Sequence, residues 1–294
     1  MIGAMSESQT VPISVIVPFY QGVSYLGHLT HSLARQGAAE VIVVVDGDQH
    51  TAQVIRAFES VPGSVVISTP HALGTAGARN FGASQATQPW LTFLDQDDSW
   101  PEGFINDLFS QPLEGVVAYD SDLYAQTGAE VPHPMGLSVF ERDNWTTSHV
   151  SAASAELLLA GFPMVKLVIP RKEFQSVNGF RTEIVAIEDF DIVWRLLAAG
   201  SEIRMLETPR GNYVVRADSI TGRIAGGDYA LGRRAHRSWI NVWTNFARSR
   251  AFPARARIGA LRNLALTAVR SGKAVAKEAI RVRSKLHQPG QGPG

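Results

Sequence analysis

Residues 90–100 read WLTFLDQDDSW, an apolar run that ends in three carboxylates, Asp95, Asp97 and Asp98. The apolar part suits a strand buried on both faces, and the acids follow where that strand ends. In an open α/β sheet, ligands bind at the carboxyl ends of the strands. Two ionised carboxylates one residue apart repel each other, so a site that holds both usually supplies a cation. The alternative is an acidic turn that caps a helix starting near Pro101.

Composition excludes several classes of function. The 294 residues suffice for one large α/β domain with an appendage. The 27 Lys and Arg balance the 27 Asp and Glu, so net charge does not indicate a nucleic-acid partner. The absence of cysteine excludes disulfides, thiolate catalysis and cysteine-ligated zinc. No apolar run approaches the roughly 20 residues of a membrane span, and we expect a cytoplasmic protein with a disordered lead-in at 1–10 and a disordered tail at 289–294.

Strands and helices alternate before residue 95. The predicted strands span 13–17, 41–45, 65–67 and 90–94, and the predicted helices span 26–33, 54–58 and 74–86. Such alternation predicts βαβ units with right-handed crossovers and a largely parallel sheet, as in a nucleotide-binding half-domain. Neither a G-x-G-x-x-G fingerprint nor a P-loop is present, so a phosphate must be bound by other means.

The second half continues the α/β pattern with a weakly patterned interruption at 120–160. Its predicted strands span 115–119, 162–169, 203–206 and 213–215, and its predicted helices cover 104–109 and the segment before Gly200. A loop as long as 120–160 is usually functional, and we expect it to handle a substrate. Trp145 in this loop suits stacking on a substrate or ordinary core packing. We therefore predict one domain at 11–222, with a nucleotide-binding half at 11–100 and a second half at 101–222 that handles the other substrate.

The remaining region, 223–288, is basic. Eleven Lys and Arg occur from Arg248 to Lys285 against the single acid Glu278, and Leu261 and Leu264 belong to an interrupted apolar stripe. This pattern predicts one or two basic amphipathic helices. They suit peripheral contact with an anionic membrane, through residues 248–285. Packing on the main domain or formation of a homodimer is the alternative.

Four features now occur in order: Asp46 after the second predicted strand, the small-residue helix from Gly74, the Asp95-x-Asp97 pair, and Glu188-Asp189 at a helix start. With this ordered set the chain resembles the family 2 glycosyltransferases, from about residue 13 to about residue 221. The resemblance implies a GT-A fold: a Rossmann-like α/β fold with a mixed, mostly parallel sheet and helices on both faces, here with a C-terminal helical extension. It also implies a nucleoside diphosphate sugar as donor, with UDP favoured, and a glycan, lipid-linked or small-molecule hydroxyl as acceptor.

The resemblance also implies roles for individual residues. The nucleotide-sugar-binding residues that it implies are Pro18, Asp46, Arg79, Asp95 and Arg216. Asp97 matches the ligand of Mg²⁺ or Mn²⁺, with Asp95 in support. A divalent cation of this kind offsets the negative charge that develops on the departing diphosphate. Asp98 either assists or caps the next helix, and Arg79 either neutralises the acids or contacts a phosphate.

Asp189 matches the base that activates the acceptor in similar inverting enzymes. A carboxylate that accepts the hydroxyl proton as the new bond forms lowers the barrier without a covalent intermediate. Glu188 and Trp145 are the acceptor-side candidates, although Glu188 also suits the first turn of a helix, as does Asp191. Arg195, four residues after Asp191, is expected to form a helical ion pair with it.

One position departs from the family pattern. Similar enzymes often carry a histidine as a further metal ligand ahead of a Ser-x-Thr pair, and this chain has Arg216 there, ahead of Ser219 and Thr221. Arginine does not ligate a cation, but it binds a diphosphate directly. Either the metal is held more loosely or Arg216 takes over part of its work. A non-catalytic or weakened nucleotide-sugar-binding module is therefore the alternative, and nucleotidyl transfer, disfavoured by the Glu188-Asp189 helix start, is a third.

Overall fold

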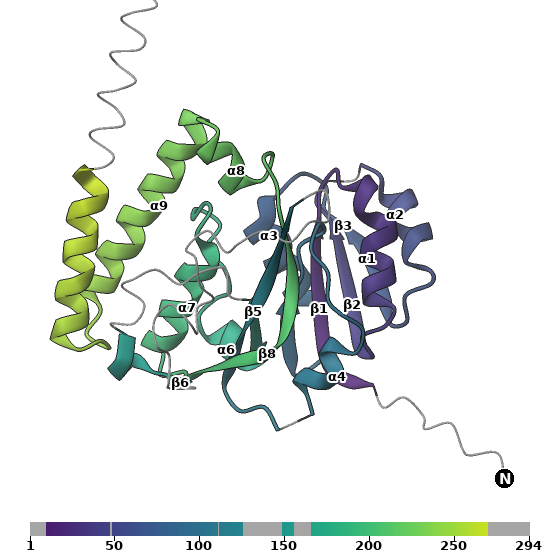
Figure 1. Cartoon of the computed structure of the whole chain (residues 1–294), viewed down its shortest axis with the longest axis horizontal. Helices are drawn as coiled ribbons and strands as arrows, with labels where there is room; N and C mark the ends of the chain where they lie inside the picture. The colour runs from purple at the N-terminus through teal and green to yellow at the C-terminus, as the bar shows by residue number, and fades with distance from the viewer. Residues whose placement is uncertain (1–9, 48, 111, 126–148, 156–165, 270–294) are drawn as a thin grey trace, which may run out of the picture.

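A single mixed sheet organises the molecule (Figure 1). The structure is a computed structural model, and it describes residues 10–47, 49–110, 112–125, 149–155 and 166–269. The predicted tail, Trp145, most of the lead-in and residues 270–288 of the basic region lie outside the described residues. The described strands are β1 (Val11–Phe19), β2 (Ala38–Val45), β3 (Ser64–Ser68), β4 (Trp90–Phe93), β5 (Val116–Ala125), β6 (His149–Val150), β7 (Lys166–Pro170) and β8 (Ile203–Val215).

The sheet is mostly parallel. Within the described residues its strand order is β3-β2-β1-β4-β7-β5-β8-β6. Strands β3, β2, β1 and β4 run parallel, β7 is antiparallel to both β4 and β5, and β8 is parallel to β5. The short β6 is antiparallel to β8. The predicted fold class is confirmed, and the parallel half brings the carboxyl ends of β1, β2 and β4 to one edge.

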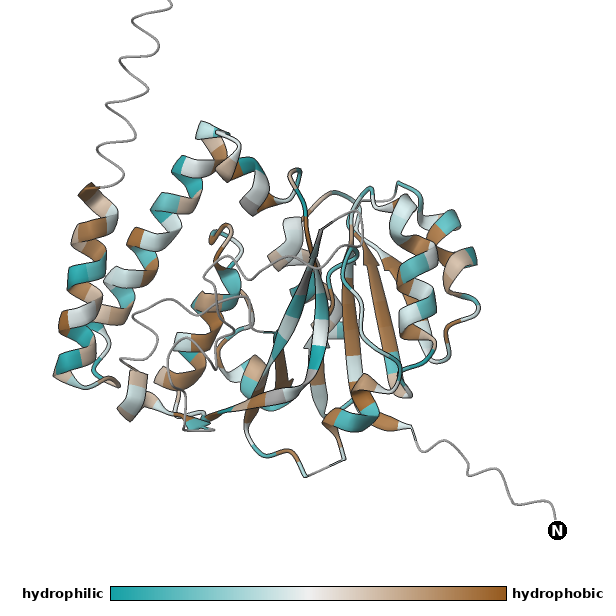
Figure 2. Ribbon diagram, in the orientation of Figure 1, coloured by the Kyte–Doolittle hydropathy of each residue, from teal (hydrophilic) through white to brown (hydrophobic). Residues whose placement is uncertain are grey.

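Helices cover both faces of this sheet (Figure 1). The described helices are the 3-10 helix η1 (Val23–Tyr25), α1 (Leu26–Leu33), α2 (Thr51–Phe58), α3 (Gly74–Gln85), α4 (Phe104–Leu108), α6 (Arg171–Ser176), α7 (Glu188–Ala198), α8 (Ile220–Ala225), α9 (Tyr229–Arg248) and a helix at 254–269. Side chains alternate along β1, so Val15 and Val17 pack with α1, α2 and α4, whereas Ile16 packs with α3 on the other face. Because both of their faces are largely buried, β1, β2 and β4 are mostly apolar, whereas β5 and β8 also carry polar residues (Figure 2).

Helix α3 lies close to the sheet because Gly82 has no side chain. A Cβ at this position would lie 2.6 Å from Ile16 Cγ2 and 3.0 Å from Val44 Cγ2. The small residues of this segment permit such close packing. The approach places the first turn of α3 beside the carboxyl ends of β1 and β2.

Three element predictions need correction. The helix after the acidic triplet of Asp95, Asp97 and Asp98 begins at Phe104. Its N-cap is Gly103, which has a φ of 75° and no side-chain cap, so none of the three acids caps this helix. The strands expected at 203–206 and 213–215 are one strand, β8, whose pairing with β5 shifts register between Tyr119 and Ser121. Helix α6 was not predicted, because its six residues are too few to show a periodic pattern.

The C-terminal helices pack on the main domain. Trp239 and Trp243 of α9 contact Phe190 of α7, and Phe246 stacks on Trp194. Figure 1 shows α9 and the helix at 254–269 side by side at one end of the molecule. The first amphipathic helix thus starts at Tyr229, earlier than the basic run indicated. None of the described helices is long and apolar enough to cross a membrane.

Candidate active site

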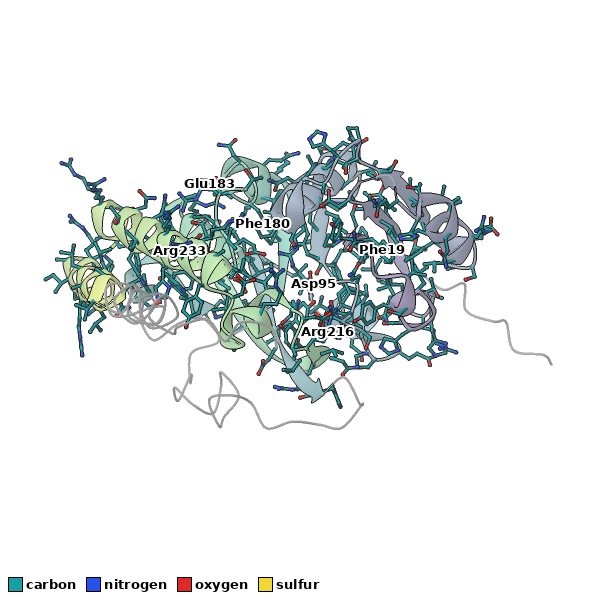
Figure 3. All side chains as sticks on the ribbon, turned by 90° about the horizontal axis from the view of Figure 1, so that it is seen from above. Phe19, Asp95, Phe180, Glu183, Arg216 and Arg233 are labelled. Carbon is teal, nitrogen blue, oxygen red and sulfur yellow. The ribbon has the colours of Figure 1, made fainter. Side chains whose placement is uncertain are left out.

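A cleft of about 690 Å³ opens at the carboxyl ends of β1, β2 and β4. The predicted site residues that line it are Pro18, Asp46, Arg79, Asp95, Asp97, Glu188, Asp189 and Arg216. Figure 3 shows Asp95 and Arg216 near one another in the middle of the molecule. The structure therefore brings together every predicted site residue that it describes.

Asp46 joins the end of β2 to the start of α3. Its Oδ1 accepts the Leu73 N–H at 2.6 Å, and its Oδ2 accepts the Gly74 N–H at 2.8 Å. Thr69 also donates its hydroxyl to Oδ1, at 3.2 Å. A carboxylate at the first turn of a helix satisfies backbone N–H groups and complements the helix dipole. Asp46 thus has a structural role that the sequence did not predict, at the rim of the predicted nucleotide site.

Asp95 is bound by two cations. Arg79 Nη2 donates to its Oδ1 at 2.5 Å, and Lys166 Nζ donates to its Oδ2 at 2.9 Å. Burial raises the pKa of Asp95, but the charges of Arg79 and Lys166 outweigh it and hold the pKa well below its usual range. Asp95 is therefore ionised at neutral pH. The prediction that Arg79 neutralises neighbouring acids is confirmed by this contact.

Lys166 is a functional candidate that sequence reasoning missed. It lies at the start of β7, and its ammonium also lies 2.9 Å from Asp98 Oδ2. Burial lowers the pKa of Lys166, but Asp95 and Asp98 raise it well above its usual value overall. A single lysine inside the apolar run PMVKLVIP, residues 163–170, was the available signal. A buried lysine requires paired acids, and the acidic triplet supplies them.

Asp98 is a buried member of the same cluster. Its Oδ1 accepts the Val214 N–H of β8 at 3.1 Å, in addition to the contact of Oδ2 with Lys166. Burial raises the pKa of Asp98 to about 7. Of the two roles predicted for Asp98, helix capping is excluded, and assistance to a metal stays a prediction.

Asp97 is paired with Arg216. Arg216 Nη1 donates to Asp97 Oδ2 at 2.8 Å, while Nε and Nη2 donate to the two oxygens of Asp218, each at 2.8 Å. The guanidinium also lies over the Tyr25 ring, 4.9 Å from its centroid. Burial raises the pKa of Asp97, and the nearby charge of Asp95 adds to this. Arg216 is thus fixed on three sides with its positive charge directed at the acidic triplet.

The start of α7 supplies two further acids. Glu188 Oε1 accepts from Arg79 Nη1 at 3.3 Å, and Asp189 Oδ1 accepts its neighbouring Phe190 N–H at 2.8 Å. Burial raises the pKa of both carboxyls above its usual value. Within the described residues Asp189 has no cation in hydrogen-bond contact, whereas Glu188 contacts Arg79, so Asp189 is the freer of the two to accept a proton.

Comparison with known proteins agrees with this arrangement. Residues 14–144 match the family model of glycosyl transferase family 2. This chain carries a family 2 glycosyltransferase domain. Over 207 residues it is 26% identical to a pre-mycofactocin glycosyltransferase of Mycobacterium tuberculosis, covering 65% of this chain and 40% of that protein. It is 28% identical to the succinoglycan biosynthesis protein ExoU of Rhizobium meliloti over 206 residues, 65% of this chain and 58% of that one.

Solved structures share the GT-A fold of this glycosyltransferase domain. TarS 1-349 of S. aureus in complex with UDP-GlcNAc has a TM-score of 0.66 at 17% identity, covering 87% of this chain and 72% of that one. The mannosyltransferase PcManGT of Pyrobaculum calidifontis, in complex with GDP-Man and Mn²⁺, has a TM-score of 0.57 at 17% identity, with coverages of 95% and 82%. The chain spans less than two thirds of the length of both curated relatives named above, so only the domain is shared with them.

The donor atoms of the glycosyltransferase domain do not fit a divalent cation as they are arranged. Asp97 Oδ2 holds the Arg216 guanidinium, and both oxygens of Asp95 hold cations. A divalent cation prefers carboxylate oxygens, and a guanidinium on the same carboxylate repels it. Within the described residues no group of three or more His, Asp or Glu side chains is placed to hold a metal. The predicted metal roles of Asp97 and Asp95 therefore remain predictions.

Asp191 is a first-turn acid of α7, as predicted, and its contacts are structural. Its carboxylate is fully buried, and it accepts hydrogen bonds from Arg181, from Arg195 and, at 3.3 Å, from Trp194 Nε1. The ion pair predicted between Arg195 and Asp191 is confirmed, at 2.8 Å. Arg195 also donates to the carbonyl of Gly179, at 2.6 Å. These contacts fix the start of α7 and so orient Glu188 and Asp189.

Proposed function

We propose that this chain transfers a sugar from a nucleoside diphosphate sugar to a hydroxyl acceptor, with inversion, in one displacement. The observation that carries the proposal is that Asp189 lies in the same cleft as the acid and cation cluster after β4. Donor chemistry needs cations for the diphosphate, and acceptor chemistry needs a base on the other side of the reacting carbon. A UDP-sugar is favoured, because the TarS neighbours are described with UDP and UDP-GlcNAc. The GDP-Man complex of PcManGT makes a GDP-sugar the alternative donor.

The proposed reaction uses the residues of the chain alone. The acceptor oxygen attacks the anomeric carbon while Asp189 accepts the hydroxyl proton, and the bond from that carbon to the diphosphate oxygen breaks. The electron pair of that bond leaves with the nucleoside diphosphate, whose growing negative charge is stabilised by cations at the cleft. Glu188 is the weaker candidate for the base, because its carboxylate is engaged by Arg79.

Divalent metal assistance was expected from the resemblance, as Mg²⁺ or Mn²⁺. The Mn²⁺ in the PcManGT complex supports it for this fold. The Arg216 contact on Asp97 does not support it for this chain. The steps above therefore involve no metal.

The decisive experiment is an assay with a panel of UDP-, GDP- and dTDP-sugars and simple hydroxyl acceptors, with release of nucleoside diphosphate as the readout. Asp189→Asn is expected to reduce transfer about 100- to 10,000-fold while calorimetric binding of the nucleotide persists. Asp107→Asn, on an exposed carboxylate of α4, is the matched control and should leave the rate unchanged. Full activity of Asp189→Asn would contradict the proposal. Nucleotide binding without any transfer would favour the binding-module alternative.

We also propose that the basic C-terminal region brings the enzyme to an anionic membrane. The helix at 254–269 exposes Ile258, Leu261 and Val269, with exposed fractions of 66%, 54% and 56%. Arg255 and Arg262 are exposed beside them. An apolar stripe with flanking arginines fits the interface of anionic lipids.

Sedimentation with vesicles tests this contact. Binding is expected to vesicles that contain phosphatidylserine at low salt, to weaken at high salt, and to be lost in the double variant Ile258→Ser and Leu261→Ser. Failure of the unaltered protein to sediment with these vesicles contradicts the proposal. A concentration-dependent dimer that the same double variant abolishes would assign the surface to a second copy instead.

A further inference from the structure

We propose that Arg216 serves as the built-in cation of the donor site, so that the nucleoside diphosphate binds without a divalent metal. This inference rests on the proposed function, since it assumes a nucleoside diphosphate as the ligand. It starts from the contact that occupies the predicted metal ligand: Arg216 Nη1 donates to Asp97 Oδ2 at 2.8 Å.

The position of Arg216 is determined by contacts on different elements. Asp218 binds it through two hydrogen bonds of 2.8 Å, Tyr25 lies under its guanidinium at 4.9 Å, and Asp97 contacts it from the loop after β4. Its side chain is 11% exposed. A guanidinium held on three sides loses little conformational entropy when a ligand binds, which favours its use as a fixed charge.

Donors remain for a ligand. A guanidinium has five N–H groups, and Asp97 and Asp218 together accept three of them. The other two have no partner among the described residues, and Arg216 lines the cleft. One of them is on Nη1 and the other on Nη2, and each can donate to an oxygen of a phosphate.

Arg216 takes over part of the work of a divalent cation. Asp97 and Asp218 share its single charge, so it lowers the repulsion between Asp97 and the ligand, and its two remaining N–H groups can donate to the leaving group as that group gains negative charge. Lys166 acts in the same way on Asp95 and Asp98, the other two acids of the triplet. Each of the three carboxylates therefore has its own protein cation, and an added metal has no carboxylate of the triplet left to neutralise.

Calorimetric titration with UDP, GDP and dTDP, in excess EDTA and separately with Mn²⁺, tests the inference. The unaltered protein is expected to bind its preferred nucleotide with dissociation constants that agree within about twofold in the two conditions. Arg216→Ala is expected to weaken binding in EDTA about 10- to 100-fold. Arg216→His is expected to make binding depend on Mn²⁺, because imidazole ligates the metal. Arg35→Ala, at an exposed ion pair with Glu102, is the matched control.

The outcomes separate the two proposals. If the unaltered protein binds a nucleotide only with Mn²⁺, Arg216 is not the cation and the inference is overturned. The same holds if Arg216→His binds as tightly in EDTA as the unaltered protein. If no nucleotide binds in either condition, the proposed donor chemistry fails, and the inference fails with it. Recovery of binding by Arg216→His on addition of Mn²⁺ also shows that this variant is folded.

Discussion

Arg79 Nη1 lies 3.3 Å from Glu188 Oε1, although the two residues are 109 positions apart in the sequence. Arg79 comes from α3 and Glu188 from the start of α7. The same guanidinium contacts Asp95 after β4. One arginine therefore joins the predicted donor side of the cleft to the predicted acceptor side, and its charge acts on both.

The first prediction concerns the pH dependence of transfer. Burial raises the pKa of Asp189, and the charge of Arg79 lowers it in part. A base must be deprotonated to act, so activity is expected to fall as pH drops through a pKa that lies above the usual range of aspartate. Arg79→Gln removes the opposing charge, raises the pKa of Asp189 further and moves this acid limb to higher pH. The profile of kcat against pH measures it, with thermal denaturation to check folding. An unchanged limb in a folded variant would show that Asp189 is not the titrating base.

The second prediction concerns Lys166. Lys166→Met leaves the buried Asp98 and the half-buried Asp95 without their shared cation, at an expected cost of about 3–5 kcal/mol in the free energy of unfolding at neutral pH. Without the ammonium the folded-state pKa of Asp98, which burial already raises to about 7, rises further, and the pKa of Asp95 rises from its lowered value. The variant is therefore more stable at low pH, where these acids are protonated, and it loses stability as pH rises through their pKa values. Urea denaturation at pH 5 and pH 8 should show the larger loss at pH 8.

A double variant controls this experiment. Lys166→Met with Asp98→Asn removes one negative charge together with the positive one, so it should regain most of the lost stability. If the double variant is as unstable as Lys166→Met alone, lost packing of the lysine stem rather than unpaired charge explains the effect.

The third prediction concerns Asp191. Its fully buried carboxylate accepts from both Arg181 and Arg195, so Asp191→Ala is expected to destabilise the fold by about 3 kcal/mol or more. Glu183→Gln is the matched control, because Glu183 is 60% exposed and lies 3.9 Å from Arg181. Its effect should stay within about 0.5 kcal/mol. Equal effects of the two changes in urea denaturation would argue against a buried structural cluster.

The fourth prediction concerns the approach of α3 to the sheet. Gly82→Ala places a methyl group against Ile16 and Val44, with an expected loss of about 1–3 kcal/mol in unfolding free energy. Gly27→Ala on α1 is the control, since a Cβ there meets nothing within 4 Å. It should be neutral or stabilise the fold by up to about 1 kcal/mol. Thermal denaturation of both variants tests the prediction, which is wrong if Gly82→Ala is the more stable of the two.

The positions of the strands and helices were largely predictable where a pattern repeats. The runs 41–45 and 90–94 are buried strands, and the leucine spacing from Leu26 to Leu33 is helix α1. Prediction failed where an element is too short to show a periodic pattern, or where its length depends on a partner that is distant in the sequence. Short α6 has too few residues for a period, and β8 is continuous because it pairs along the whole of β5.

The candidate site also has features that the sequence predicts and contacts that it does not. Acids after strands and at a helix start are visible in the sequence, and the structure brings Asp46, Asp95, Asp97 and Asp189 to one cleft. The cations that pair with these acids were harder to predict from the sequence. Lys166 lies 71 positions from Asp95 and was missed, and the contact of Arg216 with Asp97 spans 119 positions.

The sequence by itself determined the class of fold and the acids of the cleft, because strand alternation, helical period and the residue types at strand ends are local properties. Only the tertiary structure decided which cation neutralises which acid. The order of the strands in the sheet brings β7 beside β4 and the end of β8 near the triplet, and ion pairs form between side chains that are neighbours in space. The WLTFLDQDDSW stretch therefore predicted a cation at its carboxylates, and the fold supplies Arg79, Lys166 and Arg216.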